Sequence, residues 1–291
     1  MTDKTDFKDL RLAVLIDADN IPRDCIKAVM EEIAIYGTPT IKRIYGDWTS
    51  PNIGGWKMAL LENAITPIQQ YGYTTGKNST DSAMIIDAMD ILYTGNTDGF
   101  CIVSSDSDFT RLAIRLREAG MKVIGIGEKK TPGPFIVACD KFIYIEVIRD
   151  GDKAKENDKS RQPKKQQQKK SSPLKKPAEK LPEAVEPAPE TPTEKPRQET
   201  RSGKVPENIV QLIVQSVIDI ADEDGYAFMG ELGNLLLKKQ PDFDPRNFGF
   251  SKLTKLISSL GRFEIDVRQS GDAHTKHIYL RDKESMDEQQ S

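Results

Sequence analysis

The sequence predicts an α/β protein: a parallel sheet with helices on both faces, then a disordered linker and a small α+β winged helix-turn-helix domain. Short apolar runs alternate with longer, helically periodic segments over the first half of the 291-residue chain. This alternation is typical of parallel sheets. A central segment rich in proline and lysine follows, and the last third is again amphipathic. The length also favours two domains.

The first domain is expected at residues 10–148. Its strand-like runs are LRLAVLID (10–17), TIKRIYGD (40–47), the short QQYGY (69–73), FCIVSS (100–105), KVIGIG (122–127) and CDKFIYIEV (139–147). The intervening segments have helical periodicity, and they cover 22–35, 55–65, 80–93 and 108–120. Continuous apolar runs such as LRLAVLID predict strands buried on both faces.

The remaining chain divides into a linker at 149–204, a second domain at 205–282 and a disordered tail at 283–291. Residues 151–204 contain 15 basic and 9 acidic side chains, eight prolines and no aromatic residue. Such a segment cannot bury enough apolar surface to fold, so we expect an extended tether. The alternative to a simple linker is that its basic run PKKQQQKK (163–170) forms an arm that binds phosphates.

The second domain is predicted to contain three helices followed by a β-hairpin. The helical segments are NIVQLIVQSVIDIA (208–221), MGELGNLLLKKQ (229–240) and FSKLTKLISSLG (250–261), and the strands are FEIDVRQ (263–269) and KHIYLRD (276–282). This order of elements is that of a winged helix-turn-helix domain.

Composition excludes several classes of protein. No apolar run reaches the roughly 18 residues that a membrane span requires, and the polar N-terminus is unlike a secretory signal. The three cysteines are far apart and have no nearby histidine, which favours a reducing compartment, the cytoplasm, over a disulfide or zinc framework. Because the two histidines are His274 and His277, catalysis by histidine is excluded from the first domain.

Carboxylates follow the ends of separate predicted elements in the first domain. Asp17 ends the first strand, Asp106 and Asp108 follow the strand at 100–105, and Asp81 begins a helix. Ligands of open parallel sheets bind beyond the carboxyl ends of the strands. Acids gathered there repel one another unless a cation neutralises them, and oxygen-only ligands select Mg²⁺ or Mn²⁺.

The segments LIDADN, GKNSTDSAMIIDAMD and IVSSDSDFTRLA resemble the three acidic motifs of NYN domains, the LabA-like branch of the PIN-like nucleases. The resemblance covers about residues 10–148 and implies a Rossmann-like sheet and a metal-dependent ribonuclease. By motif, the metal-binding and catalytic acids would be Asp17, Asp81, Asp106 and Asp108. The polar Asn20 and, less directly, Asp87 match further positions of these motifs.

Other residues are candidates for hydrogen bonds or RNA contacts. Ser105 is placed to bond the acids or a phosphate, although strand-end serines more often serve as caps. Lys77 precedes Asp81 by four residues, and Lys129 and Lys130 stand in a Gly/Pro loop. Each of these lysines is either a candidate for contact with a phosphate or an ordinary solvated side chain.

The words YAFMGELGNLL and FDPRNFGFSKLTKLISSLGRFEI resemble the OST-HTH, or LOTUS, domain. That family is associated with RNA binding, and in some members with protein contacts. Lys252 and Lys255 are three residues apart and therefore neighbours on a helix. They are candidate RNA contacts, but a solvated helix face explains them equally well, and residues 205–291 hold more acids than bases.

These observations predict an Mg²⁺- or Mn²⁺-dependent ribonuclease with a tethered RNA-binding module, no membrane association and an undetermined oligomeric state. The alternative is a catalytically weak NYN-fold protein that binds RNA or a regulatory protein partner. A haloacid-dehalogenase-type phosphatase is a third reading, because Asp17 and Asp19 form a D-x-D after a strand. It leaves the acids of SSDSDF unexplained.

Overall fold

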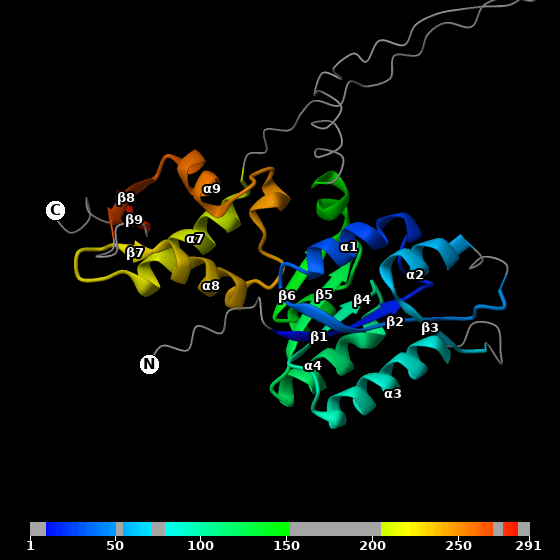
Figure 1. Cartoon of the computed structure of the whole chain (residues 1–291). Helices are drawn as coiled ribbons and strands as arrows, with labels where there is room; N and C mark the ends of the chain where they lie inside the picture. Colours follow the sequence, from blue (N-terminus) through cyan, green and yellow to red (C-terminus); the bar gives the residue numbers. More distant parts are fainter. Residues whose placement is uncertain (1–9, 51–54, 72–78, 152–204, 270–275, 285–291) are drawn as a thin grey trace, which may run out of the picture.

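The computed structural model describes residues 10–50, 55–71, 79–151, 205–269 and 276–284 (Figure 1). Lys77, residues 152–204 of the linker predicted at 149–204 and residues 285–291 of the tail predicted at 283–291 lie outside these ranges. The described elements form a six-stranded sheet flanked by helices and a smaller C-terminal domain with its own three-stranded sheet. The predicted fold class is thereby confirmed.

All six strands of the large sheet are parallel, in the order β3-β2-β1-β4-β5-β6. The strands are β1 (Arg11–Asp17), β2 (Thr38–Gly46), β3 (Thr66–Gln69), β4 (Gly99–Val103), β5 (Lys122–Gly127) and β6 (Lys141–Tyr144). The chain builds outward on one side of β1 and then crosses to β4 on its other side. The order therefore reverses between β1 and β4, where open parallel sheets bind ligands.

Helices cover both faces of this sheet. Helices α1 (Ile26–Ile33) and α2 (Lys57–Asn63) lie on one face, and α3 (Ser79–Thr94), α4 (Thr110–Glu118) and α5 (Gly133–Ala138) lie on the other (Figure 1). Short 3-10 turns, η2 (Arg23–Cys25) and η4 (Ser107–Phe109), precede α1 and α4. No helix among the described residues combines the length and apolarity of a membrane span.

Strand β1 divides its side chains between two apolar cores. Leu12, Val14 and Ile16 pack with the α1 and α2 side, whereas Ala13 and Leu15 pack with the α3 and α4 side. Successive side chains of a strand point to opposite faces. This alternation explains why nearly every residue of the run is apolar, and it places residue 17 on the α3 and α4 face.

Three local predictions were wrong. Strand β6 ends at Tyr144, and residues 145–151 are helical because Ile145 and Ile148, three apart, both enter the core. The short strand lies at 66–69, earlier than the predicted 69–73. The Gly/Pro loop after β5 contains α5, whose prolines occupy the cap and first turn, where proline is tolerated.

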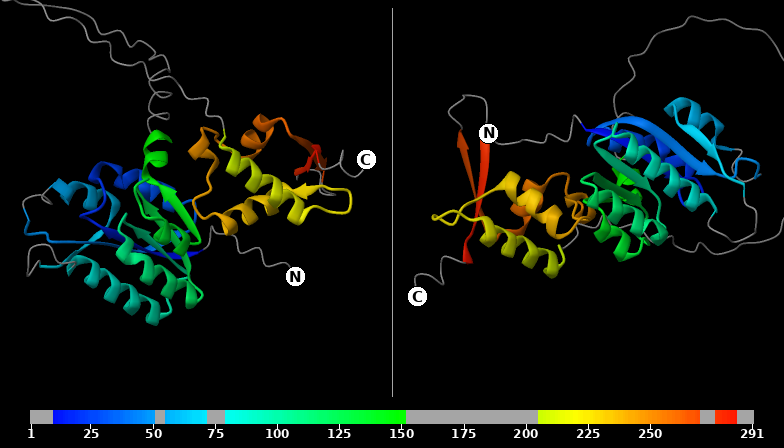
Figure 2. Two further views of the ribbon diagram at one scale, coloured as in Figure 1. Left: turned by 180° about the vertical axis from the view of Figure 1, so that it is seen from behind. Right: turned by 90° about the horizontal axis from the view of Figure 1, so that it is seen from below.

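The C-terminal domain has the predicted three helices and hairpin. Its elements are α7 (Glu207–Ile220), β7 (Ala227–Phe228), α8 (Met229–Lys239), η5 (Pro245–Phe248), α9 (Leu253–Leu260), β8 (Phe263–Gln269) and β9 (Lys276–Asp282). The short β7 joins the hairpin to form an antiparallel sheet in the order β7-β9-β8. A separate apolar core includes Ile213, Leu236 and Leu256. The domain lies beside β6 rather than β3 (Figure 2).

Gly127, the last residue of β5, is required by close packing. A Cβ atom there would lie 2.7 Å from the carbonyl oxygen of Ser104 and 2.7 Å from the hydroxyl of Thr131. We expect Gly127→Ala to lower the free energy of unfolding by about 1–3 kcal/mol, because backbone must move to accept the methyl group. Urea titration measures this. Gly133→Ala is the matched control, since a Cβ there meets no atom within 4 Å; equal losses in both variants would contradict the packing argument.

Candidate metal centre

Asp17 is buried at the carboxyl end of β1, with 1 % of its surface exposed. Its Oδ1 accepts a hydrogen bond from the backbone N–H of Asp19 at 3.1 Å. Its Oδ2 accepts from Asn20 Nδ2 at 2.6 Å and from the Ser104 hydroxyl at 2.8 Å. These donors compensate for the lost hydration of the carboxylate, since burying a charge is costly unless it is hydrogen-bonded.

Ser104 joins the two halves of the site. It follows β4 and is fully buried on the same sheet face as Asp17. Its hydroxyl donates to Asp17, and its oxygen accepts the backbone N–H of Asp106 at 3.1 Å. The carboxyl ends of β1 and β4 are thus connected across the point where the strand order reverses.

The turn after β4 presents two further acids. Asp106 is the N-cap of η4, and its Oδ1 accepts the backbone N–H of Asp108 at 2.9 Å. One carboxylate oxygen each of Asp106, Asp108 and Asp81 lies within 4.8 Å of the others. Asp81 comes from the first turn of α3. Elements distant in sequence therefore bring three carboxylates to one point beside Asp17.

The electrostatics of this cluster are unfavourable for negative charge. Partial burial, followed by the charges of Asp17, Asp106 and Asp108, raises the pKa of Asp81 to about 6. Burial and the charge of Asp17 also raise the pKa of Asp19. Uncompensated like charges disfavour ionisation, whereas a hard cation would reverse this effect. An all-oxygen donor set suits Mg²⁺ or Mn²⁺.

Asp87 is held away from this cluster by other partners. It forms an ion pair with Arg43 and accepts a hydrogen bond from the hydroxyl of buried Tyr45. Burial and the bond to Asp87 raise the pKa of Tyr45, so its hydroxyl stays a donor. These contacts between β2 and α3 account for Asp87 without a metal ion.

Ser105 supports the loop that carries Lys129 and Lys130. Its Oγ accepts a hydrogen bond from the backbone N–H of Glu128 at 2.9 Å. This contact holds the loop after β5 and does not involve the acids of the cluster. The backbone N–H of Lys129 donates to Glu146, and the Lys130 ammonium pairs with Glu128 at 2.5 Å while remaining 72 % exposed. Both lysines follow β5, on the same end of the sheet as the acids.

Asp47 is a rim acid that the sequence analysis did not single out. It follows β2, where its Oδ1 accepts hydrogen bonds from Thr49 and from Gln69 Nε2. Its charge also contributes to the raised pKa of Asp19. The signal was available, because Asp47 ends a strand that the same alternation predicts to be parallel to β1.

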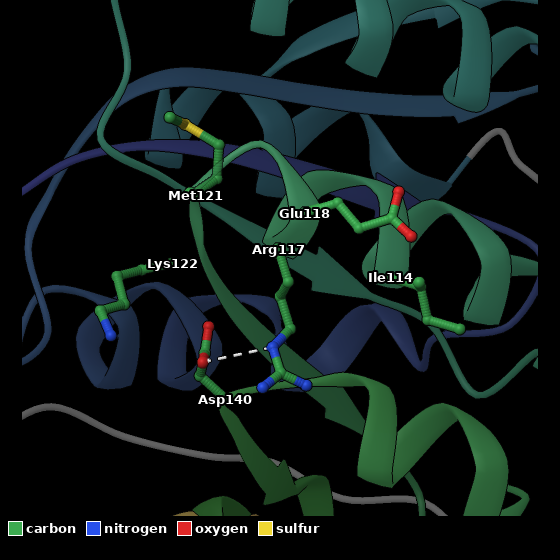
Figure 3. Close-up of a pocket in the computed structure, with 7 residues that line it drawn as sticks. Ile114, Arg117, Glu118, Met121, Lys122 and Asp140 are labelled. Carbon is green, nitrogen blue, oxygen red and sulfur yellow. Dashed lines mark ion pairs between the residues drawn. The ribbon is translucent and has the colours of Figure 1, made fainter.

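A shallow pocket elsewhere on the domain does not contain this chemistry. It is lined by residues at the end of α4 and the start of β5, including Arg117 and Lys122, and by Asp140, which precedes β6 (Figure 3). Arg117 Nε pairs with Asp140 at 3.3 Å, and Asp140 also accepts the backbone N–H of Val123. The pocket lies at the amino ends of the strands, opposite the acid cluster.

Comparison with known families agrees with this geometry. The model of the NYN domain matches residues 11–146, and that of the OST-HTH/LOTUS domain matches residues 201–274. The chain contains an NYN domain followed by a C-terminal OST-HTH/LOTUS domain. NYN domains belong to the PIN-like nuclease superfamily, and OST-HTH/LOTUS domains bind RNA.

Two solved structures are similar to parts of this chain. A protein of unknown function from Vibrio parahaemolyticus is 19% identical, with a TM-score of 0.42, over 50% of this chain and 96% of its own. An uncharacterized protein from Nitrosomonas europaea is 28% identical, with a TM-score of 0.26, over 32% of this chain and 89% of its own. No curated protein matches the chain.

The raised pKa of Asp81 makes the stability of the metal-free protein depend on pH. Folded Asp81 holds its proton up to about pH 6, whereas the unfolded group releases it near 3.8. Stability therefore falls as pH rises through this window. We expect Asp81→Asn to be more stable than the wild type at pH 7, by about 1 kcal/mol after allowance for solvent screening.

Thermal unfolding in a chelator at pH 3.5 to 8 measures this difference, which should close at the acidic end. Asp90→Asn is the control, because Asp90 is an exposed acid of the same helix. A stability difference between wild type and Asp81→Asn that is constant over this pH range would exclude titration of Asp81 as its cause.

Proposed function

We propose that this NYN protein is an Mg²⁺- or Mn²⁺-dependent ribonuclease that hydrolyses phosphodiester bonds at the acid cluster. The observation that carries the proposal is the meeting of Asp81, Asp106 and Asp108 within 4.8 Å, beside buried Asp17. The three free cysteines are buried, which suits a reducing compartment, and we place the protein in the cytoplasm.

In this mechanism, the four aspartates would hold the cation. A cation bound there would make a water molecule a better nucleophile and would stabilise the leaving oxygen of the phosphodiester. Ser104 keeps Asp17 oriented through its donated hydrogen bond, and the cap at η4 fixes Asp106. Asn20 Nδ2 donates a second hydrogen bond to the same oxygen of Asp17. Because water would be the nucleophile, no protein nucleophile would be required.

The OST-HTH domain would supply affinity for RNA. Lys252 and Lys255 are exposed at the start of α9, while Lys129 and Lys130 extend from the rim of the acid cluster. Ammonium groups that contact phosphates bind nucleic acid independently of sequence and with strong dependence on salt. Substrate would thus be held by the second domain and by the rim lysines.

Removal of one metal ligand tests the catalytic proposal. We expect Asp17→Asn and Asp106→Asn each to reduce Mn²⁺-dependent cleavage of labelled RNA at least about a hundredfold. Asparagine preserves the cap at position 106, because both residue types cap helices well. Cleavage is followed on gels with single-stranded and structured RNA, with Mn²⁺ or chelator, and circular dichroism verifies the fold.

Asp90→Asn, on the exposed face of α3, should cleave like the wild type. Full activity in both ligand variants would refute the assignment. RNA binding without cleavage by the wild type would instead favour the regulatory alternative, and efficient hydrolysis of p-nitrophenyl phosphate would favour the phosphatase.

The contribution of α9 to RNA binding is separately testable. We expect the double variant Lys252→Gln/Lys255→Gln to raise the apparent KM severalfold and leave kcat unchanged, since these residues are remote from the acids. The slope of log affinity against log salt should decrease by up to about 1.4, if both ammonium groups contact single-stranded RNA.

Lys238 is exposed on α8, so Lys238→Gln is the control for the loss of one positive charge. It is compared with the single variants Lys252→Gln and Lys255→Gln. Saturation curves at two salt concentrations provide the measurement. An unchanged KM and salt slope in the double variant would remove α9 from the RNA interface, and would favour a protein partner for that surface.

A further inference from the structure

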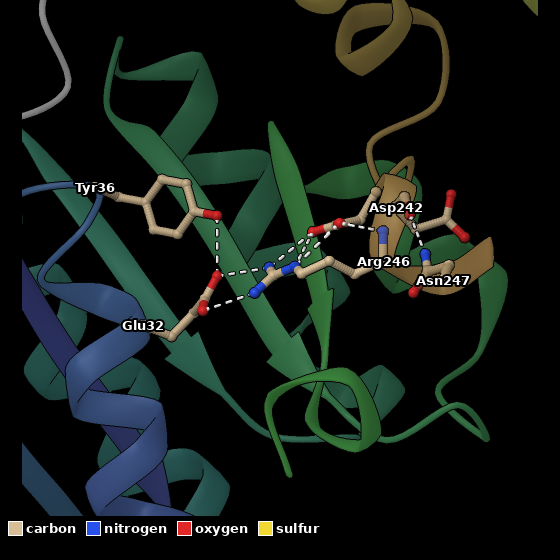
Figure 4. Close-up of polar contacts among 6 residues, drawn as sticks. Glu32, Tyr36, Asp242, Arg246 and Asn247 are labelled. Atoms are coloured by element: carbon tan, nitrogen blue, oxygen red, sulfur yellow. Dashed lines mark hydrogen bonds and ion pairs between the residues drawn. The ribbon is translucent and has the colours of Figure 1, made fainter. Parts of the chain in front are cut away.

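Arg246 of the OST-HTH domain binds Glu32 of the NYN domain through two parallel hydrogen bonds. Its Nη1 donates to Glu32 Oε2 at 2.9 Å, and its Nη2 donates to Glu32 Oε1 at 2.7 Å (Figure 4). Arg246 also donates through Nε and Nη2 to Asp244 at 2.8–3.1 Å. Only 8% of the Glu32 side chain is exposed. Bidentate contacts of this type are directional as well as charged.

Charges around this bridge are mutually compensated. The hydrogen bonds to Glu32, and then to Asp244, raise the pKa of Arg246. Burial alone would raise the pKa of Asp244, but the hydrogen bonds from Arg246 outweigh it and lower that pKa. Burial lowers the pKa of Lys141, whose ammonium lies 5.2 Å from the ring centre of Tyr36. Two acids and two bases are thus partly withdrawn from water together, an arrangement that becomes costly if one partner leaves.

The edge of the large sheet is engaged at the same interface. The backbone N–H of Phe142 in β6 donates to the carbonyl oxygen of Pro241 at 2.8 Å. The hydroxyl of Tyr144 donates to Asp242 at 2.7 Å. Asn247 Nδ2 donates to the Asp242 carbonyl oxygen at 2.9 Å (Figure 4). An edge strand carries unpaired donors and acceptors, and here the second domain satisfies one of them.

This interface leaves the acid cluster uncovered. Glu32 lies near the end of α1 and Lys141 begins β6, so both lie at the amino ends of the strands. Asp17 and Asp106 lie at the opposite, carboxyl ends. The apolar cores of the two domains remain separate, so polar contacts dominate the junction.

We propose that the OST-HTH domain is docked on the NYN domain through the Glu32–Arg246 bridge and the Phe142–Pro241 bond, so that both domains move as one body. RNA held by the second domain then reaches the acids in one orientation, and cleavage occurs at a set distance from the bound segment. This last consequence rests on the proposed function, whereas docking does not.

The backbone N–H of Phe142 reports docking at a single site. Its hydrogen exchange, measured by NMR on the full chain without RNA or metal, should be protected in the wild type. Arg246→Gln should accelerate this exchange at least about tenfold, because it leaves Glu32 without its charged partner. Amides of β4 and α8 should be unchanged in the variant, which separates undocking from unfolding. Arg268→Gln, which removes an arginine paired with Asp266 on the hairpin, should leave Phe142 protected.

A double-mutant cycle identifies the bridge itself. Glu32→Gln should accelerate exchange of Phe142 as Arg246→Gln does, and the combined variant should add little to either. Independent, additive effects, or an unprotected Phe142 amide in the wild type, would overturn the docking proposal.

A second measurement maps the positions of cleavage on an RNA that contains one segment bound by the OST-HTH domain. Undocked Arg246→Gln should give a broader distribution of cuts than the wild type. An identical distribution would overturn the orientation role. A wild type that does not cleave would refute the proposed function, while the exchange data would still decide docking.

Discussion

The reversal of strand order between β1 and β4 is the constraint on which the site depends. Adjacent parallel strands end at the same edge, and the chain leaves that edge in opposite directions, toward α1 and toward α4. Open parallel sheets bind ligands between such departing segments. Asp17 and Ser104 lie at these two strand ends and are joined by a hydrogen bond. Asp106 is positioned relative to this pair, since Ser104 also accepts its backbone N–H.

The charges at the domain junction are balanced, whereas those of the acid cluster are not. At the junction of the domains, Glu32 and Asp244 are balanced by Arg246 and Lys141, so the group is complete as it stands. At the rim, partial burial and the charges of the surrounding acids raise the pKa of Asp81. Clusters that are electrostatically incomplete are common at functional sites, whereas balanced ones are usually structural. By this criterion Asp87, paired with Arg43, belongs to the structural group.

Periodicity and the acids at strand and helix ends were sufficient to predict the parallel sheet, the hairpin domain and the proximity of Asp17, Asp81 and Asp106. They failed where a short apolar run fits two structures, as at 145–151, because only packing against the core distinguishes helix from strand there. They also failed for contacts distant in sequence. Nothing local to Asp87 indicates Arg43, and Glu32 and Arg246 are separated by 214 positions. The sequence therefore predicted two tethered domains and gave no sign that they are in contact.

Both borders of the large sheet are protected against pairing with another chain. At β3, Pro67 lacks an N–H and removes one donor from the outermost strand. At β6, the segment at Pro241 occupies the donor of Phe142. Free strand edges are templates for aggregation, and natural proteins cover or interrupt them. The C-terminal domain therefore also covers the β6 edge of the NYN domain. A chain cut before the C-terminal domain would expose this edge, which includes Phe142 and Tyr144, to β-pairing with another chain.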